Sequence, residues 1–539
     1  MNDIHINTSV HVSQHNITFM EINMEDSFIQ LNDLPDEMLM MIFKKLSNIE
    51  VLDSLIDVNR RLTQIVSDST FTNHLAVMKS LPNGHIYPLD DSILDRFCLQ
   101  ILPEIHRKIK WFDLESTSME RVLLATNYPN LTGLSLYNIH EETLTHLFTD
   151  EIRFTRNFKN QILSLIIDMN TNEEEDVLED IIPIIFSYIF KAFTNLQHLK
   201  FGSSSSSCPR LSFYNTCPFL NSSNLLELHV NLETFNDCLY LCDGRFNQLH
   251  TLDVNILRIQ SSNVILNNAE NLPALKCFSL SSSNHTFEYD ELILPLLHRM
   301  LNLEKLHLYL FICGRETFID GNEMKFSIVN HLNHLNTFTF NIYSFIDFNS
   351  EINLLPSNEH IQKSFRNFQY SQTSSFVDYF PKFEVGQCHI YSHPYPLEHF
   401  DTITNNFSGG TFQFVRKILL FDERPFEHEF FLQISQSFPV LQKLSVVNRT
   451  RQNNKLLRRS KTVSRNLSII EFPHLTELDL TAVHLDYVKQ FLFDTKTCLP
   501  NDVRFIVYHR LVRKATRNFT RNTTKQNYSK VNLILFYKI

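Results

Sequence analysis

The sequence predicts an α/β protein in which a small N-terminal bundle of three helices precedes an irregular solenoid of strand-containing repeats, curved as an arc or horseshoe. Three observations lead to this prediction. The chain has 539 residues, far more than one compact core usually holds. Residues 34–66 carry apolar side chains at three- and four-residue steps, the spacing of helices. Beyond this segment, one short apolar pattern recurs to the end of the chain. We therefore expect four segments: a disordered tail over 1–28, a helical domain over 29–80, a connecting segment over 81–105 and the repeats over 106–539.

Composition narrows the functional class. The formal net charge is −11, so bulk electrostatics do not favour nucleic acid as a partner. The most apolar run, residues 181–190, is much shorter than the ~20 residues of a membrane span. The N-terminus lacks a basic start followed by an apolar core, so we expect no secretory signal and a cytoplasmic or nuclear protein. The closest cysteines, Cys238 and Cys242, lack histidines at zinc spacing, and no metal or other cofactor is expected.

The first predicted helix follows Leu34-Pro35, where proline suits the first helical turn because its missing N–H is not needed there. Four apolar residues recur at helical spacing and are expected on one face: Met38, Leu39, Ile42 and Leu46. Ser47 and Glu50 form a capping-box pattern that predicts the start of a second helix. The expected core residues of the second and third helices are Ile49, Leu52, Leu55 and Ile56, then Val58, Leu62, Ile65 and Val66. Three such short helices bury too little area to be stable alone, so they need a neighbour or a partner.

Residues 34–71 resemble an F-box. The resemblance rests on Leu34-Pro35, Glu37, Ile42-Phe43, Leu46, Leu55, Val58 and the basic pair Arg60-Arg61. In that family the helices dock onto a Skp-type adaptor, which bridges to the cullin scaffold of a ubiquitin ligase. By position, the resemblance implies an adaptor-facing or bundle-forming set of Leu34, Pro35, Ile42, Phe43, Leu46, Leu55 and Val58. The sequence departs from the family pattern at Asn59, Leu62 and Phe71, where the family often has Cys, Trp and Trp. Ile42 and Phe43 are the first positions to test by substitution with Asp.

The recurring pattern is apolar-x-x-apolar-x-apolar. Clear copies start at Leu131, Ile162, Leu196, Leu225, Leu249, Leu275, Leu303, Leu335, Leu441 and Leu475, and weaker ones at Ile109, Phe365, Val385, Val415, Val503 and Val531. An aromatic residue three positions before several starts, as in "YPNL" and "FPHL", is expected to close the turn into the strand. The period and pattern resemble leucine-rich repeats, whose longer, irregular members fit best. Each copy predicts a short strand, followed by a turn and a helical or irregular arm.

Alternate side chains of a strand point to opposite faces, so the residues between the apolar positions are expected on an exposed concave wall. The candidates for binding a target protein there are Tyr137, Lys200, His229, Asp253, His307, Tyr309, Glu477 and Asp479. The acidic run 173–180 is expected to be a solvated helix start and the serine run 203–207 a turn. The basic stretch 455–465 is expected to be a loop, with a nuclear-import or acidic-partner patch as the alternative. The basic stretch 509–530 is expected to form a positive end of the molecule, with a phosphate or nucleic-acid contact as the alternative.

No nucleotide-binding, metalloprotease, hydrolase or kinase motif occurs, and no catalytic residue is predicted. The combined resemblance implies the substrate-recognition subunit of a Skp–cullin–F-box ubiquitin ligase, which is not itself an enzyme. Its partners would be the adaptor, through it a cullin, and an unknown target protein, with no membrane. The alternative is a repeat scaffold that binds proteins and uses its helices only for stability. An enzyme would require a convergent cluster of titratable residues in a pocket.

Overall fold

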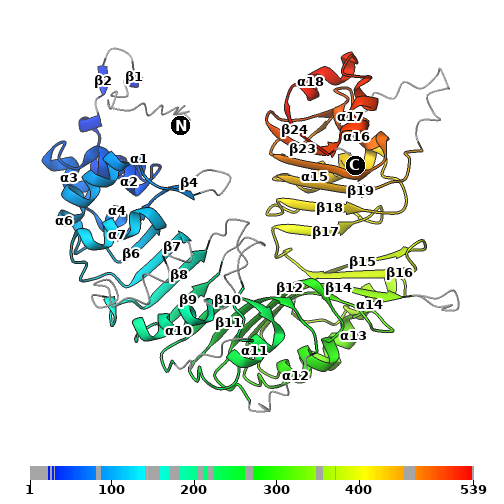
Figure 1. Ribbon diagram of the computed structural model, residues 1–539, viewed down its shortest axis with the longest axis horizontal. Helices are drawn as coiled ribbons and strands as arrows, with labels where there is room; N and C mark the ends of the chain where they lie inside the picture. Colours follow the sequence, from blue (N-terminus) through cyan, green and yellow to red (C-terminus); the bar gives the residue numbers. More distant parts are fainter. Residues whose placement is uncertain are drawn as a thin grey trace. The chain divides into compact units, whose positions relative to one another are not determined.

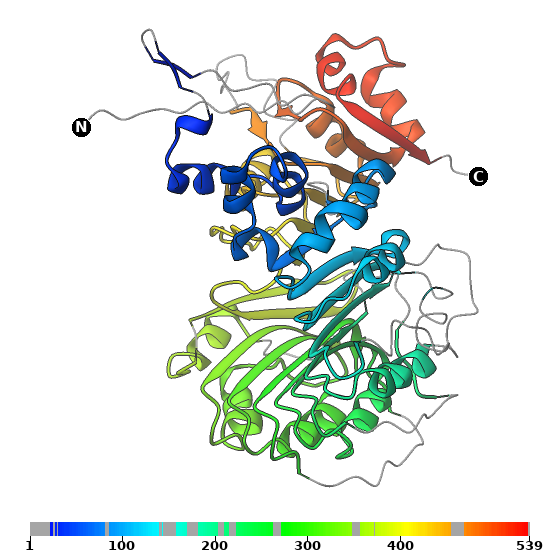
Figure 2. The same ribbon diagram turned by 90° about the vertical axis from the view of Figure 1, so that its left-hand side faces the viewer.

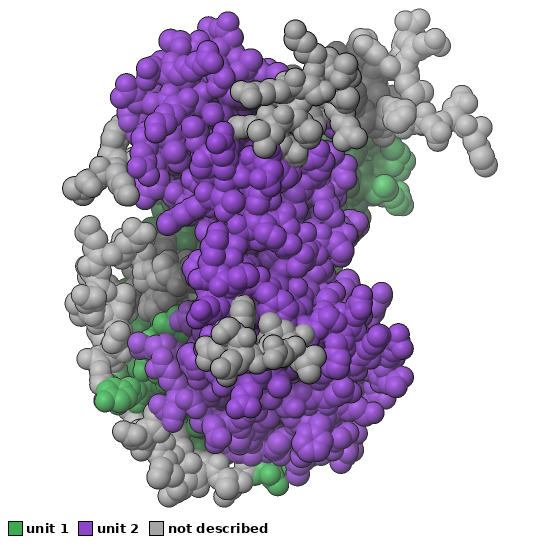
Figure 3. Space-filling view, turned by 90° about the vertical axis from the view of Figure 1, so that its right-hand side faces the viewer, with its two compact units in different colours: residues 1–257, 262–277 green, residues 258–261, 278–539 purple. Residues whose placement is uncertain are grey.

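The protein is a mixed α/β molecule built on parallel sheets (Figure 1). The computed structural model describes residues 22–24, 27–29, 31–80, 86–139, 143, 158–169, 182–202, 210–214, 222–261, 271–347, 356–370, 372–453 and 468–536. The chain forms two compact units, one of residues 1–257 and 262–277 and the other of residues 258–261 and 278–539 (Figure 3). None of the helices in the described part of the chain has the length and apolar content that crossing a membrane requires. The predicted domain boundaries stay predictions.

Unit 1 contains the N-terminal helices and a sheet with the strand order β3, β6, β7, β8, β9, β10, β11. Its helices are η1 (Leu31–Asp33), α1 (Asp36–Phe43), α2 (Asn48–Leu55), α3 (Arg60–Val66), α4 (Ser69–Thr72), α5 (Asp91–Arg96), η2 (Phe97–Ile101), α6 (Leu102–Ile105), α7 (Ser116–Ala125), α10 (Ile182–Ala192) and α11 (Phe235–Leu241). Its strands are β1 (Ile22–Met24), β2 (Ser27–Ile29), β3 (His74–Val77), β4 (Lys79–Ser80), β5 (Ile86–Tyr87), β6 (Trp111–Glu115), β7 (Gly133–Ile139), β8 (Ser164–Met169), β9 (His198–Phe201), β10 (Glu227–Thr234) and β11 (Thr251–Arg258).

The three helices expected near the N-terminus are present, and they belong to the blue helical part of Figure 2. Helix α2 packs against the edge strand β3 of the unit-1 sheet. The capping box of α2 is confirmed: the backbone N–H of Glu50 donates to Ser47 Oγ at 3.3 Å, and that of Ser47 donates to Glu50 Oε2 at 2.9 Å. Asn59 caps α3 by accepting a hydrogen bond from the N–H of Leu62 at 2.8 Å. Arg61 joins the third helix to the first through an ion pair with Asp36 at 2.6 Å.

The four apolar residues expected on one face of α1 differ in burial. Leu39 and Phe43 are buried, whereas Met38 and Ile42 point to solvent. The Phe43 ring packs edge-on against Phe71 at 6.4 Å, which fixes the orientation of the helix. The prediction for α2 is confirmed, since Ile49, Leu52, Leu55 and Ile56 are all buried. In the third helix Leu62, Ile65 and Val66 are buried, but Val58 lies outside the helix and is exposed.

The repeat pattern correctly predicts strands. In all ten clear copies the strand begins two residues after the first apolar residue, and the three apolar positions are buried. The aromatic residues before four of these copies, Tyr128, Phe193, Phe438 and Phe472, are buried too. Each accepts a hydrogen bond at its carbonyl from the N–H three residues later, as in Leu131 N to Tyr128 O at 3.3 Å. Neighbouring strands from β3 and β6 to β10 pair in parallel.

In the described part of unit 2, the strands β12, β13, β14, β16 and β15 follow one another in one sheet, and β17, β18, β19, β21, β23 and β24 in a second. Strands β20 and β22 form a two-stranded sheet. Its strands are β12 (Cys277–Thr286), β13 (Lys305–Ile312), β14 (Thr337–Asp347), β15 (Thr373–Phe380), β16 (Val385–Ser392), β17 (His399–Ile403), β18 (Lys417–Phe421), β19 (Lys443–Asn448), β20 (Ile470–Glu471), β21 (Glu477–Val483), β22 (Thr497–Cys498), β23 (Val503–Tyr508) and β24 (Val531–Phe536). Its helices are η3 (Tyr289–Ile293), α12 (Leu294–His298), α13 (Gly321–Met324), η4 (Lys325–Val329), α14 (Asn358–Ser364), α15 (His428–Ser437), α16 (Leu485–Leu492), α17 (His509–Thr516), η6 (Asn522–Thr524) and α18 (Lys525–Tyr528).

The regular repeat is interrupted between β14 and β17. The weak copy at Phe365 is not a strand, because this residue follows α14 and packs its ring against Phe368 at 5.5 Å. The weak copy at Val385 is a strand, β16, but it runs antiparallel to β14 and forms a hairpin with β15. The weak copies at Ile109, Val415, Val503 and Val531 precede or begin parallel strands, as predicted.

Candidate functional site

The outward face of α1 is an exposed apolar surface. Met41 is 69% exposed and Ile42 41% exposed, and Met38 adjoins them one turn earlier. We call Met38, Met41 and Ile42 the α1 surface. It exists because Leu39 and Phe43, on the opposite side of the helix, already fill the interior. Side chains of this size contribute about 1.5–3 kcal/mol each when they are fully buried, so this face gains stability from any partner that covers it.

The residues of the predicted adaptor set separate into two classes. Pro35, Ile42 and Val58 are exposed, and Leu34 and Leu46 are partly buried. Phe43 and Leu55 lie in the interior and are 3% and 4% exposed. Only the first group presents atoms to a partner in this conformation. The sequence prediction omitted Met41 and placed Met38 on the same helix face as Leu39, although the run "MLMMIF" contains a second apolar stripe one residue away from Leu39 and Phe43.

The outward face of the unit-1 sheet is polar. His229 on β10 lies between two carboxylates, with Nε2 2.6 Å from Glu227 Oε1 and Nδ1 3.0 Å from Asp253 Oδ2. The row continues across β9 and β8, where His198 Nδ1 lies 3.2 Å from Ser164 Oγ. The structure thus brings two predicted target-binding residues, His229 and Asp253, into direct contact. Lys200 is the register neighbour of His229 on β9 and is exposed.

The charge of His229 depends on these contacts. The hydrogen bond with Asp253 raises the pKa of His229 above its ordinary value, and the bond with Glu227 adds to this, although partial burial acts in the opposite direction. Protonated His229 can donate from both ring nitrogens, which matches two carboxylate acceptors. The raised pKa widens the pH range in which His229 is an imidazolium between its two carboxylate partners, a surface suited to mixed-charge protein partners.

A second polar cluster on the same face was not predicted. The Nε1–H of Trp111 donates to Asp113 Oδ1 at 2.8 Å and to Ser135 Oγ at 2.9 Å. The indole covers Gly133 on β7 so closely that a Cβ there would lie 1.8 Å from the ring. The sequence did contain a signal for this cluster. Trp111, the one tryptophan, and Gly133 occupy the same position in two neighbouring strands, and a glycine within a strand often marks the close approach of another group. Tyr137, a predicted site residue, lies at the end of the same strand and is half-buried.

The corresponding face of unit 2 is not an open wall at β14 and β16, which corrects the prediction. The ring of Tyr343 stacks on Phe311 at 4.7 Å and on His389 at 3.8 Å, in strand register. Its hydroxyl donates to the carbonyl of Asp401, and the Phe400 ring lies 5.1 Å from His389. Residues of β17 thus contact these outward positions. We call Phe311, Tyr343 and His389 the aromatic ladder.

The four remaining predicted site residues lie at outward strand positions of unit 2 and are partly buried. His307 and Tyr309 are on β13, beside the aromatic ladder. Glu477 and Asp479 are on β21 of the other sheet. Glu477 lies between Lys443 at 3.9 Å and Arg504 at 3.6 Å, so this row is mostly cationic. Asp479 Oδ1 accepts hydrogen bonds from the N–H and hydroxyl of Thr481, both at 2.8 Å. This carboxylate oxygen therefore already bonds to a neighbour in its own strand.

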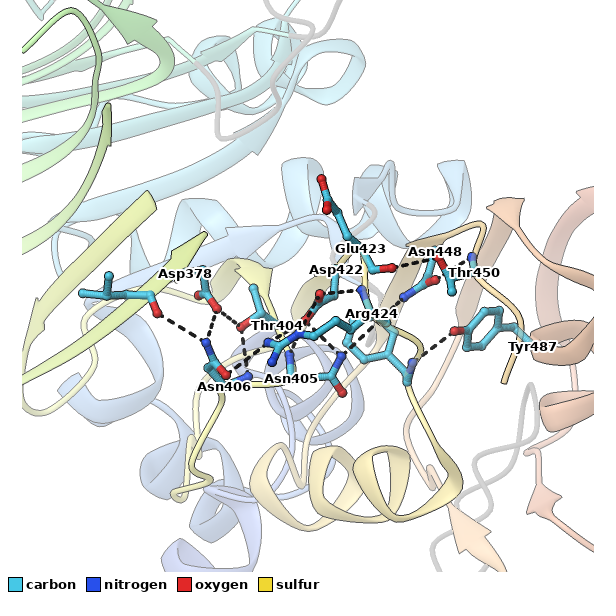
Figure 4. Close-up of polar contacts among 12 residues, drawn as sticks. Asp378, Thr404, Asn405, Asn406, Asp422, Glu423, Arg424, Asn448, Thr450 and Tyr487 are labelled. Carbon is cyan, nitrogen blue, oxygen red and sulfur yellow. Dashed lines mark hydrogen bonds and ion pairs between the residues drawn. The ribbon is translucent and has the colours of Figure 1, made fainter. Parts of the chain in front are cut away.

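A buried polar network follows the strand ends of unit 2 (Figure 4). Asp378 Oδ1 accepts hydrogen bonds from the Thr404 hydroxyl and from Asn406 Nδ2, both at 2.7 Å. Asp422 Oδ2 accepts from both nitrogens of Asn405 at 2.9 Å. Burial raises the pKa of Asp378 to about 6, and the nearby Asp422 carboxylate adds to this. These hydrogen bonds join the two aspartates to residues 404–406 of the same chain, so the network stabilises the fold of unit 2.

Acid–base chemistry finds no support elsewhere in the described residues. A cavity of about 770 Å³ beside α14 is lined by Glu359, Lys363 and Arg366 together with amide and aromatic side chains, and it contains neither Asp378 nor Asp422. In the described part of the chain, no group of three or more His, Cys, Asp or Glu side chains could hold a metal ion. Cys238 and Cys242 are buried free thiols. The acidic run 173–180, the serine run 203–207 and the basic stretch 455–465 lie outside the described residues.

Comparisons with known proteins were made for the whole chain. No family model matches it. No curated protein matches it either. Among solved structures, one described as a crystal structure of the Rad7 and Elc1 complex in yeast is similar at a TM-score of 0.31 and 13% identity, over 82% of this chain and 92% of that chain. A likeness of this size does not assign the chain to a family.

Proposed function

We propose that the chain is the substrate-recognition subunit of a Skp–cullin–F-box-type ubiquitin ligase. One observation carries the proposal: α1 holds its outward apolar residues Met38, Met41 and Ile42 in solvent while Leu39 and Phe43 complete the interior. The F-box resemblance of residues 34–71 supports a Skp-type adaptor as the partner that covers this surface. Val58, exposed in the turn between α2 and α3, would extend the contact.

The target protein would bind outward strand positions of the repeats. In unit 1 these positions carry Lys200, His229 and Asp253 on adjacent parallel strands. In unit 2 His307 and Tyr309 and, on the second sheet, Glu477 remain candidates. Asp479 is the weakest candidate, because its carboxylate already serves Thr481.

The chain would supply no catalytic group. It would hold the target near a ubiquitin-charged enzyme that the cullin brings, so the rate enhancement would come from effective concentration. A function in the cytoplasm, the nucleus or both is consistent with this role.

The test is retention of a purified Skp-type adaptor on the immobilised full chain. Wild type should retain the adaptor, and Met41→Asp/Ile42→Asp should lose it, because two carboxylates would have to be desolvated in the contact. Leu124→Asp, an equally drastic change at an exposed residue of α7, is the matched control and should retain it. Phe43→Asp is unsuitable, because it would bury a carboxylate in the interior between the helices and unfold them.

The alternative is a scaffold without ligase association, in which the helices only stabilise the end of the sheet. The contact of α2 with β3 is the observation that favours it. If the folded wild-type chain does not retain the adaptor, the ligase proposal fails and the scaffold stands.

A further inference from the structure

The C-terminal end of unit 2 has a charge opposite to that of the rest of the chain. Residues 503–539 contain nine cations and no Asp or Glu. Since the whole chain carries −11 and this segment +9, residues 1–502 carry −20. The cations are Arg504, Arg510, Arg513, Lys514, Arg517, Arg521, Lys525, Lys530 and Lys538. Such segregation concentrates a positive potential on one end of a negative molecule.

Helix α17 lies beside α16 and β23 (Figure 1). Its residues Val512 and Ala515 belong to the buried core, whereas Arg510, Arg513 and Lys514 are exposed. Among the described residues, no carboxylate forms an ion pair with these three side chains or with Arg517. Their charges are therefore available to a partner.

The turn after α17 is held in an unfavourable conformation. Arg517, Asn518 and Phe519 have φ angles of 51°, 57° and 66°, in the left-handed region that non-glycine residues rarely adopt. Hydrogen bonds maintain it: Asn518 N donates to Arg513 O at 2.9 Å and Phe519 N to Thr516 Oγ1 at 3.0 Å. The Phe519 ring is 43% exposed, packs on the Tyr528 ring at 5.4 Å, and follows Arg517 by two residues in the chain. Left-handed backbone strain of this kind clusters at functional turns, including binding sites.

We propose that Arg510, Arg513, Lys514, Arg517 and Phe519 form a docking surface for an acidic segment of a partner protein. We call it the C-terminal basic surface. Carboxylates of the segment would pair with the cations, and an apolar side chain would pack on Phe519. A protein segment fits better than nucleic acid because the described residues of this surface offer one exposed ring, Phe519, for stacking, whereas single-strand binders present several.

This proposal goes beyond the ligase function, because it uses neither the α1 surface nor the outward strand positions of unit 1. It holds equally for a scaffold. The adaptor experiment and the one below can therefore fail independently of each other.

The experiment measures binding of a fluorescent poly-glutamate peptide and of an oligothymidylate of equal net charge to the full chain by anisotropy. We expect the peptide to bind more tightly, with an affinity that falls as salt is added. The triple variant Arg510→Glu/Arg513→Glu/Lys514→Glu should weaken peptide binding at least ten-fold. Its control, Lys325→Glu/Lys363→Glu/Lys382→Glu, makes the same charge change at exposed lysines of unit 2 and should change binding less than two-fold. A poly-glutamate peptide that contains phenylalanine should bind wild type more tightly than plain poly-glutamate does, and Phe519→Ala should remove that gain.

The proposal is overturned if neither probe binds, if the oligothymidylate binds more tightly than the peptide, or if the control triple weakens the peptide as much as the α17 triple. Thermal melts of each variant establish that the chain is folded. If the α17 triple does not fold, Arg517→Glu with Phe519→Ala replaces it, because both side chains lie on the exposed turn and leave the buried face of α17 intact.

Discussion

The outward strand positions of the two units differ, although the same apolar pattern builds both. In unit 1 these positions carry polar side chains such as Lys200, His229 and Asp253, which remain accessible or half-buried. In unit 2, at β14 and β16, they carry stacked aromatic rings that residues of β17 contact. The apolar pattern therefore determines the inward face of a repeat, and the intervening residues determine whether its outward face can bind or only packs. Four experiments on the two units follow, from the largest expected effect to the smallest.

Tyr343→Ala should cost about 3–5 kcal/mol of unfolding free energy, because it removes a fully buried ring that stacks on two neighbours. Tyr137→Ala makes the same change at an outward position of unit 1 and should cost less than about 1 kcal/mol, since the ring is only half-buried. Chemical denaturation of both variants measures the contrast. Equal losses of unfolding free energy in the two variants would contradict the difference between the outward strand positions of the two units.

Deprotonation of the buried Asp378 carboxyl should lower the unfolding free energy of unit 2 as pH rises. Its folded pKa of about 6 lies above the ordinary 3.8, so the native state holds the proton more tightly than the unfolded chain does. The resulting stabilisation, about 3 kcal/mol at about 1.4 kcal/mol per pKa unit, is fully present below pH 3.8 and lost as pH rises through 6. Asp378→Asn should not show this loss. Parallel denaturation curves of the two proteins across pH 3.5–7.5 would contradict the assignment.

Gly133→Ala should destabilise unit 1 by about 1–3 kcal/mol, because the new Cβ would overlap the Trp111 ring. Trp111 is the only tryptophan of the chain, so its fluorescence should shift directly with the displaced ring. Adding Trp111→Leu should restore most of the lost stability. A wild-type spectrum and melting curve for the single variant would mean that the ring does not lie on Gly133.

The pKa of His229 should fall when Asp253, the partner that raises it most, loses its carboxylate. An NMR titration of the imidazole should show an elevated pKa in wild type and a lower one in Asp253→Asn, with a smaller decrease in Glu227→Gln. Because the folded pKa is raised, the contribution of His229 to stability is present below its ordinary pKa and is lost as pH rises through the folded value. For a surface group it should be less than about 1 kcal/mol. An unchanged pKa in Asp253→Asn would exclude the contact.

The period of the pattern was enough to predict the parallel strands, because each copy buries the same three apolar positions whatever lies between them. It was not enough for α1. The stripes Leu39/Phe43 and Met38/Ile42 have the same four-residue spacing, and only the tertiary contact with Phe71 decides which one is buried. Local pattern failed at Phe365 for the same reason, since ring packing after a helix satisfies the same apolar residues.

The state of the outward faces could be predicted only in part. Lys200, His229 and Asp253 were found because alternation along a strand is a local rule. The aromatic ladder was missed because Phe311, Tyr343 and His389 come from strands far apart in the sequence, and because the β15–β16 hairpin breaks the parallel order. Burial of an outward residue depends on such distant segments.

The central claim is that the outward face of α1 docks a Skp-type adaptor. Hydrogen–deuterium exchange of the full chain with and without the purified adaptor tests it most directly. We predict slower exchange in Asp36–Phe43 and in the turn that contains Val58, with no change in β8 to β11. Unchanged exchange in α1 at saturating adaptor, or protection confined to the strands of unit 1, would contradict the account.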